Sequence, residues 1–152
     1  MKSPMNERLV APCGINCAVC ACYLARVNGT WEKGIKIPQC PGCLPRNKMC
    51  ANLRKWCPKI GKGRIRFCHE CADFPCSHLK GMDGRYRARY RTSPVENPER
   101  IRDRGMRSFL AWQRRKWRCQ RCGGTISCHN GLCFSCDLKV LRKKKKKYSW
   151  DD

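Results

Sequence analysis

Paired cysteines are the residues of this chain with the clearest capacity for chemistry. The sequence WRCQRCGG begins at residue 117, and CFSC follows at residues 133–136. A CxxC pair forms a tight turn that brings both sulfurs toward one ion, and Gly123 permits the sharp backbone turn after the second cysteine. Two such pairs can supply four thiolates to a tetrahedral zinc ion. The predicted ligands are Cys119, Cys122, Cys133 and Cys136.

Two other residues of this region, Cys128 and His129, lie in the loop between the pairs. We interpret them as loop residues outside the metal site. Because residues 81–118 contain no cysteine, the region 119–138 is expected to form its own zinc-ribbon-like module.

A larger group of candidate ligands lies between residues 13 and 78. Its CxxC pairs include CPGC at 40–43 and CHEC at 68–71. Grouping in chain order and cross-bracing of the first cluster with the third are both open, since a helix would point Cys20 and Cys22 in different directions. His69, inside the CHEC pair, is expected to face solvent. The predicted ligands are Cys13, Cys17, Cys20, Cys22, Cys40, Cys43, Cys50, Cys57, Cys68, Cys71, Cys76 and His78.

The metal at the first cluster has an alternative. Cys13, Cys17 and Cys20 have the spacing of the iron–sulfur motif of radical enzymes, but those enzymes use a large barrel that 152 residues cannot supply. An ordinary iron–sulfur cluster in a redox or accessory protein stays open as the second hypothesis. Disulfides are disfavoured because the first residues show no apolar stretch of about seven residues or more, as a secretory signal would. A reducing, cytoplasmic location is therefore predicted.

The composition explains why metal is needed. Leu, Ile, Val and Phe supply 25 of 152 residues, the formal net charge is +23, and there are 16 cysteines. Such a chain would ordinarily be disordered. A structural zinc site contributes about 10–16 kcal/mol, against about 5–15 kcal/mol for the stability of a whole domain. We predict a small, metal-stabilised, irregular α+β fold of zinc knuckles or a ribbon, with a few short helices, little hydrophobic core and three to four zinc ions.

Helical signals occur in two places. Residues 18–27 place apolar side chains on one helical face and stop at Asn28-Gly29. Further on, Asn97 and Pro98 suit the start of a short helix, Gly105 its end, and residues 106–115 a second helix. The expected buried side of this pair consists of Ile101, Met106, Phe109, Leu110 and Trp112.

Four regions follow from this pattern: a multi-cysteine region 1–80, an Arg-rich helical segment 81–118, the module 119–138 and a flexible basic tail 139–152. Arginine matches phosphate geometry, tyrosine can stack on unpaired bases, and a lysine run releases counterions on binding phosphates. A solvated tail is the alternative interpretation of the lysine run alone. The predicted nucleic-acid contacts are Arg85, Arg87, Arg89, Arg91, Arg114, Arg115, Lys116, Arg118, Lys143, Lys144, Lys145, Lys146 and Lys147.

Three segments carry a resemblance to a known family. LVAPCGINCAVCACYLAR, FCHECADFPCSHLK and WRCQRCGG…CFSC resemble a widespread prokaryotic family of cysteine-rich proteins of unknown function, over about residues 9–136. The resemblance implies a small cytoplasmic protein, presumed to bind zinc, with no assigned reaction. The heavy Arg and Lys content and the 143–147 run depart from that family and point to a polyanion.

The functional expectation combines both features. We expect a zinc-stabilised RNA-binding protein associated with the ribosome, with ribosomal RNA and ribosomal proteins as partners. No residues are placed for acid–base catalysis, so no enzyme activity and no small-molecule substrate are predicted. No apolar segment approaches the length of a membrane span, and no membrane partner is expected.

Overall fold

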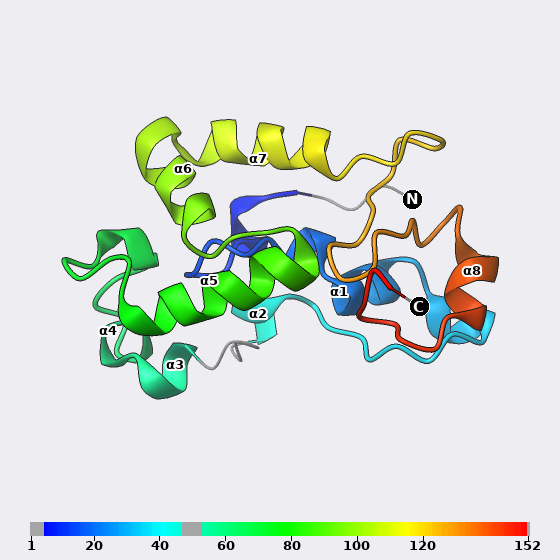
Figure 1. Cartoon of the computed structure of the whole chain (residues 1–152), viewed down its shortest axis with the longest axis horizontal. Coiled ribbons are helices and arrows are strands. Elements are labelled where there is room, and N and C mark those ends of the chain that lie inside the picture. Colours follow the sequence, from blue (N-terminus) through cyan, green and yellow to red (C-terminus); the bar gives the residue numbers. More distant parts are fainter. Residues whose placement is uncertain (1–4, 47–52, 152) are drawn as a thin grey trace.

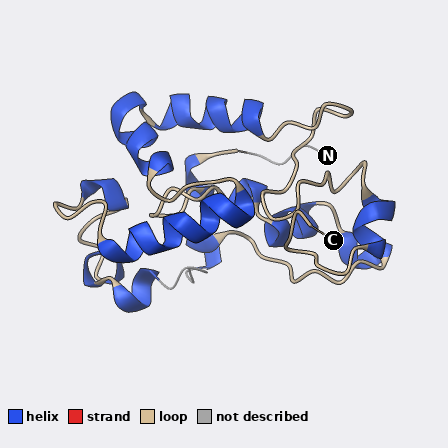
Figure 2. Cartoon of the chain, in the orientation of Figure 1, coloured by secondary structure: helices blue, strands red, loops and turns tan. Residues whose placement is uncertain are grey.

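The computed structural model describes residues 5–46 and 53–151, and helices dominate this part of the chain (Figures 1 and 2). The α-helices are α1 (Ala21–Val27), α2 (Cys43–Arg46), α3 (Leu53–Trp56), α4 (Pro58–Gly61), α5 (Ser77–Tyr90), α6 (Glu96–Arg104), α7 (Met106–Lys116) and α8 (Leu138–Lys143). The 3-10 helices are η1 (Glu7–Leu9), η2 (Cys17–Val19), η3 (Thr30–Lys33) and η4 (Cys68–Glu70).

The N-terminal segment lies at the centre of the molecule, between α7 and α5 (Figure 1). Leu9 packs in a first hydrophobic cluster with Phe109 of α7, and Ala11 packs in a second with Leu79 of α5. Leu24 of α1 belongs to a third cluster, which includes residues of the C-terminal region. The core is therefore three clusters joined by one early segment of chain.

Helix α1 and the pair α6–α7 occur where the sequence predicts them. Helix α1 ends at Val27, and Asn28 and then Gly29, at φ 58°, follow it. Gly105 separates α6 from α7, as predicted. Of the predicted apolar stripe, Ile101, Phe109 and Leu110 are buried, while Met106 and Trp112 are partly buried against them.

The start of α6 differs from the prediction. The helix begins at Glu96, because the hydroxyl of Ser93 accepts a hydrogen bond from the Glu96 N–H at 2.8 Å. Asn97 is therefore inside the helix rather than its cap, and it is buried at 1% exposure. Its Nδ2 donates to the carbonyl of Gly14 at 2.9 Å, which ties α6 to the N-terminal segment.

Helix α5, the longest in the described part of the chain, overlaps the start of the predicted helical segment 81–118, but the sequence pattern assigns no helix to its residues. It covers residues 85–90, RYRARY, and only Leu79 and Met82 along its length are buried. With so few apolar residues it shows no helical periodicity in the sequence. The helix is stabilised instead by the packing of these two side chains on α3 and α4 in the second cluster.

The β part of the predicted fold is reduced to isolated bridges. The described residues contain three of them, Val10 with Asn16, Arg118 with Thr125 and Ile126 with Cys133, and no strand. A small cysteine-rich fold is confirmed, but it is mostly helical rather than α+β. None of the described helices has the length and apolar composition needed to cross a membrane.

The segment predicted as a flexible basic tail begins inside α8. Leu141 of this helix is fully buried against α1, and Arg142 donates to the carbonyl of Lys33 at 2.8 Å. The chain then returns to the body, where Trp150 Nε1 donates to the carbonyl of Cys128 at 2.8 Å. Residues 138–151 are thus held against the body by Leu141 near one end and Trp150 near the other. The lysine run between these two residues makes the segment look like a solvated tail in the sequence.

Candidate metal centre

Four sulfurs meet where the two C-terminal CxxC turns face each other. The Sγ atoms of Cys119, Cys122, Cys133 and Cys136 all lie within 4.8 Å of one another. Cys119 and Cys136 are 3.9 Å apart, and Cys122 and Cys133 are 3.6 Å apart. A tetrahedral ion with metal–sulfur bonds of about 2.3 Å separates its sulfurs by about 3.8 Å, whereas a disulfide bond is about 2.05 Å. The group therefore has the dimensions of a single metal site.

The backbone of the first turn holds its sulfurs in place. Gly123 has φ 74°, the left-handed value expected of it, and its N–H donates to the carbonyl of Cys119 at 2.9 Å. The next N–H, of Gly124, donates to the sulfur of Cys122 at 3.4 Å. In the second turn the N–H of Cys136 donates to the sulfur of Cys133 at 3.4 Å. These N–H groups favour sulfur in its thiolate form.

The four thiols differ in acidity. The pKa of Cys119 is lowered to about 6, mainly because the backbone N–H groups of Cys122 and Arg121 donate to its sulfur. The pKa of Cys136 is raised to about 12, mainly by its hydrogen bond with the sulfur of Cys122. Burial raises the pKa of Cys133. A dication bound among them would compensate the charge of further thiolates and release their protons.

A carboxylate supports the second turn from outside. Asp137 accepts a hydrogen bond from the N–H of Cys133 at 2.8 Å and forms an ion pair with Arg121 of the first turn. It therefore links the two CxxC turns without being a ligand. Cys119 and Cys133 are buried while Cys122 and Cys136 are exposed, so one edge of the site faces solvent.

Cys128 and His129 lie outside the four-sulfur group, and both have a structural role. Cys128 is 2% exposed, and its N–H donates to the carbonyl of Val19 at 2.9 Å. His129 Nδ1 accepts a hydrogen bond from the N–H of Ala21 at 3.1 Å. Burial lowers the pKa of His129 to about 4, so the ring is neutral and able to accept that bond. The loop that contains Cys128 and His129 therefore attaches the module 119–138 to the start of α1.

The N-terminal cysteines are not gathered in the same way. Among the described residues only the C-terminal four bring three or more potential ligand atoms within 4.8 Å. Cys13 of the first cluster lies near Cys43 and Cys68, and the N–H of Cys43 donates to the sulfur of Cys17 at 3.4 Å. Cys20 instead lies near Cys22 and Cys128. Cys13, Cys17 and Cys20 therefore face different partners, and their ligand roles stay predictions.

The remaining candidates of this region have other neighbours. Cys40 accepts from the Gly42 N–H at 3.4 Å and from Arg46 at 3.8 Å, and Cys71 accepts from Lys59 at 3.1 Å. Cys57 and Cys76 lie near Cys68.

The ring of His78 packs on Trp56 at 3.6 Å between centroids. His69, expected to face solvent, has a buried Nε2 because its ring stacks on Phe67. Cys50 lies outside the described residues.

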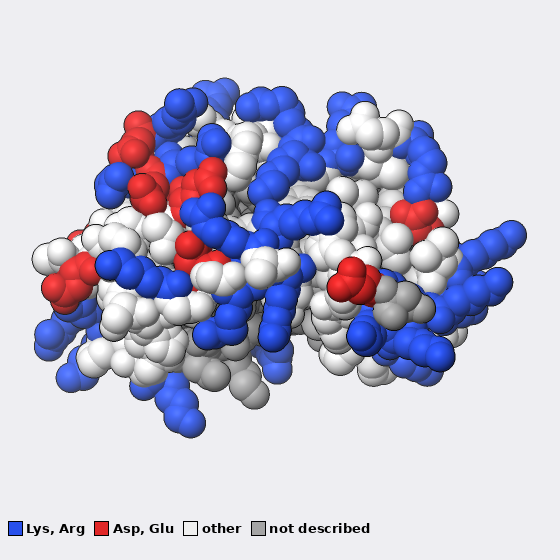
Figure 3. Space-filling view, viewed as in Figure 1, with Lys and Arg blue, Asp and Glu red and all other residues white. Residues whose placement is uncertain are grey.

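The predicted nucleic-acid contacts are spread over three parts of the fold. Helix α5 carries Arg85, Arg87 and Arg89, and Arg91 follows it directly. The last turn of α7 carries Arg114, Arg115 and Lys116, and Arg118 lies two residues beyond. The lysine run begins with Lys143, the last residue of α8. Figure 3 shows Lys and Arg spread across the face viewed with uncharged surface between them, while Asp and Glu are fewer and lie mainly toward the end with α4 and α6.

Several of these cations have partners within the protein. Arg114 donates to the carbonyl of Met5 at 2.8 Å, Lys116 to that of Arg91 at 2.7 Å and Lys147 to that of Leu141 at 2.7 Å. Their hydrogen bonds to backbone carbonyls leave the positive charge uncompensated.

The fold and the four-sulfur group define a small, mostly helical, cysteine-rich protein with a site that could hold a metal ion. Residues 9–81 match the model of a family described as protein of unknown function (DUF3795), which confirms the predicted resemblance over a shorter stretch than residues 9–136. No curated protein and no solved structure matches the chain. The matched stretch ends before the four-sulfur group begins.

Proposed function

We propose that this protein is a zinc-binding protein whose basic surface binds RNA, with ribosomal RNA and ribosomal proteins as partners. The excess of cationic side chains carries the RNA half of the proposal. The formal net charge is +23 on 152 residues, and Lys and Arg are spread across the whole face in Figure 3. Such a surface repels itself, and phosphates relieve the repulsion by neutralising the charge.

The choice of zinc is supported by the size and chemistry of the four-sulfur group. Thiolates are soft ligands, and four of them in a tetrahedron suit zinc or iron. A [4Fe–4S] cluster holds each cysteine on a separate iron and a [2Fe–2S] cluster holds two on each iron, so neither brings all four sulfurs within 4.8 Å of one another, as they are here. The contacts of 3.6 and 3.9 Å fit one ion. The ribbon-like turns that bind it are then a zinc ribbon with β-bridges in place of strands.

The choice of RNA over DNA is supported by the form of the basic surface. Its cations come from the sides and ends of α5 and α7 and from the chain after α8. The sequence carries no finger, helix-turn-helix or basic-zipper pattern that would place a recognition helix in a major groove. Contacts to phosphates without strong base preference are therefore expected.

Elemental analysis and sedimentation test the two halves separately. The purified protein should be colourless and contain zinc, and iron with inorganic sulfide would refute the metal assignment. In lysate fractionated at low and high salt, the protein should sediment with ribosomes at low salt and be released at high salt. A free monomer at every salt concentration, with no RNA retained, would refute the RNA half alone.

A further inference from the structure

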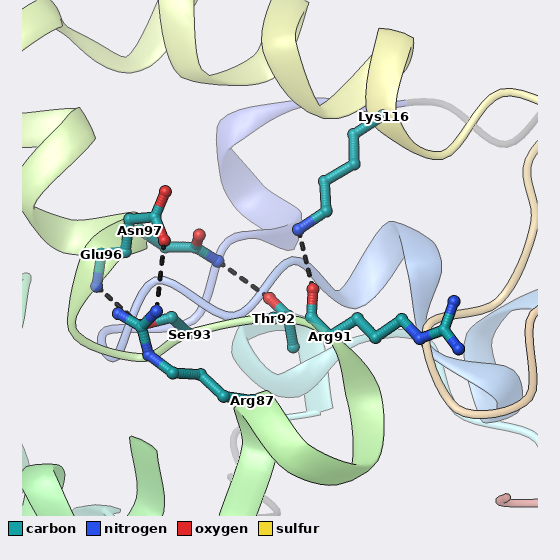
Figure 4. Close-up of a pocket in the computed structure, with 7 residues that line it drawn as sticks. All are labelled: Arg87, Arg91, Thr92, Ser93, Glu96, Asn97 and Lys116. Carbon is teal, nitrogen blue, oxygen red and sulfur yellow. Dashed lines mark hydrogen bonds and ion pairs between the residues drawn. The ribbon is translucent and has the colours of Figure 1, made fainter. Parts of the chain in front are cut away.

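A basic pocket lies where α5, α6 and α7 meet, and none of the four cysteines of the four-sulfur group lines it (Figure 4). Its volume is about 250 Å³. A water molecule occupies about 30 Å³ in the liquid, so the pocket has room for a tetrahedral oxyanion. Arg87 reaches it from α5 and Lys116 from the end of α7, with Thr92 between them.

Lys116 is a cation that the protein itself leaves partly unsatisfied. Its ammonium group donates to the carbonyl of Arg91 at 2.7 Å, which uses one of three N–H donors. Burial lowers the pKa of Lys116, although the charge of Glu96 partly opposes this effect. Across the described ranges, no carboxylate forms an ion pair with it. An anion in the pocket would supply the missing acceptor.

Thr92 is a preorganised hydroxyl donor. The residue is 5% exposed and lines the pocket. Its Oγ1 accepts a hydrogen bond from Asn97 Nδ2 at 3.2 Å, and the other Nδ2 hydrogen of Asn97 is bound to the carbonyl of Gly14. The hydroxyl hydrogen of Thr92 is therefore available to a ligand, while the position of its oxygen is fixed by a buried amide.

Arg87 is held at the opposite side by carboxylates. Its Nε donates to Asp83 at 2.8 Å, and its Nη1 lies 3.7 Å from Glu96, which also pairs with Arg100 at 3.4 Å. A guanidinium has five N–H donors, so these contacts leave others for an anion. Glu96 is the one carboxylate that lines the pocket, and Arg87 and Arg100 compensate its charge.

Arg91 shapes the pocket through its backbone. It is the one described non-glycine residue with a positive φ, 53°, a conformation that costs energy for any residue with a Cβ atom. This turn directs its carbonyl toward Lys116, while its guanidinium stacks on the ring of Trp150 at 3.7 Å in a neighbouring cavity.

We propose that this pocket binds one phosphate group through Lys116, Arg87 and the hydroxyl of Thr92. The inference rests on the proposed function for the source of that phosphate, an RNA backbone. Free phosphate or a small phosphorylated compound presents the same chemistry. A dedicated pocket differs from a diffuse basic surface because it needs an uncharged residue, Thr92, as well as cations.

Isothermal titration of the full, metal-loaded chain with inorganic phosphate, and separately with a single-stranded RNA, tests the pocket. Lys116→Gln should weaken phosphate binding about tenfold or more, because a charge-assisted hydrogen bond disappears. Arg107→Gln is the matched control, since it removes the same charge from an exposed residue of α7 that lies outside both the pocket and the predicted RNA contacts. Thr92→Val should weaken binding and Thr92→Ser should restore it. Glu96→Gln should strengthen phosphate binding, because it removes the carboxylate that lines the pocket.

The outcomes separate the pocket from the proposed function. Weaker binding of both phosphate and RNA by Lys116→Gln, but not by Arg107→Gln, supports the pocket and an RNA source. Weaker binding of phosphate alone supports the pocket with a small phosphorylated ligand and places the pocket outside the RNA surface. Equal losses of affinity in both variants, or no phosphate binding by the unaltered chain, would overturn the pocket, and salt-dependent RNA binding would then stand without it.

Discussion

The N–H of Cys128 donates to the carbonyl of Val19 at 2.9 Å, and this bond joins the loop of the C-terminal metal module to the segment that precedes α1. Val19 and Cys128 also share the first hydrophobic cluster. Phe134, between the two ligands of the second CxxC turn, is fully buried with Leu24 of α1 in the third. The module that the sequence presents as separate thus shares its packing with the N-terminal region.

Removal of one of the four cysteines should therefore change the structure around α1. We expect Cys122→Ser to lower the bound zinc by one ion and to change the amide resonances of residues 19–25, since the turns that position Phe134 lose their metal. Zinc analysis and heteronuclear NMR measure both effects. Cys128→Ala is the control: it should keep the zinc because its sulfur is no ligand. Unchanged resonances in α1 after loss of the metal would show that the module folds alone.

Phe134 should be a large contributor to stability. Phe134→Ala removes a fully buried ring, and such changes cost about 3–5 kcal/mol. Val140→Ala, on the exposed side of α8 at 54% exposure, should change the free energy of unfolding by about 0.5 kcal/mol or less. Urea unfolding with zinc present measures both. Similar costs for the two variants would contradict the packing of the module on α1.

The packing of the chain end can be tested at Gly131. A Cβ added there would lie 2.3 Å from the ring of Trp150, and the residue has φ 73°. Gly34 has a similar φ of 78° with no atom within 4 Å, so Gly34→Ala measures the backbone cost alone, about 1–2 kcal/mol. Gly131→Ala should cost more, and its tryptophan fluorescence should shift as Trp150 is displaced. Equal costs without a shift would place Trp150 elsewhere.

RNA affinity should depend on where the charges lie. Replacing Lys143, Lys145 and Lys146 by Gln keeps Leu141 and Trp150 in place, which deletion of the segment would not. The slope of log affinity against log salt should fall by about 0.7–0.9 for each phosphate that the variant no longer neutralises. Replacing Lys55, Lys62 and Arg64 removes the same charge from the region of α3 and α4. Equal slopes for the two triple variants would indicate a charge effect without a defined surface.

The four-sulfur group was predictable because its determinants are local. The conformation of each CxxC turn is set by its own residues, including Gly123 in the first turn. Only the approach of the two turns to each other depends on the rest of the fold. Helix α7 was predictable for a related reason: Gly105 marks its start, and Phe109 and Leu110 mark its buried face.

Other features depend on contacts between distant residues. Helix α5 buries only Leu79 and Met82, so the signal for it lies in α3 and α4 rather than in its own sequence. The phosphate pocket depends on Asn97, whose amide bridges Gly14 and Thr92. The distance in sequence between Gly14 and Asn97 hides that role, and Asn97 is more easily interpreted as a helix cap.

The central position of the N-terminal segment has a consequence during synthesis of the chain. Residues 9–24 are made before their partners in the first and third clusters, which include Phe109, Cys128, Phe134 and Leu141. At about 5–20 residues per second, the early segment waits roughly 5–25 s for them. In that interval Cys17 and Cys20 are not yet covered by the late elements of the first cluster. These two thiols are then most open to oxidation.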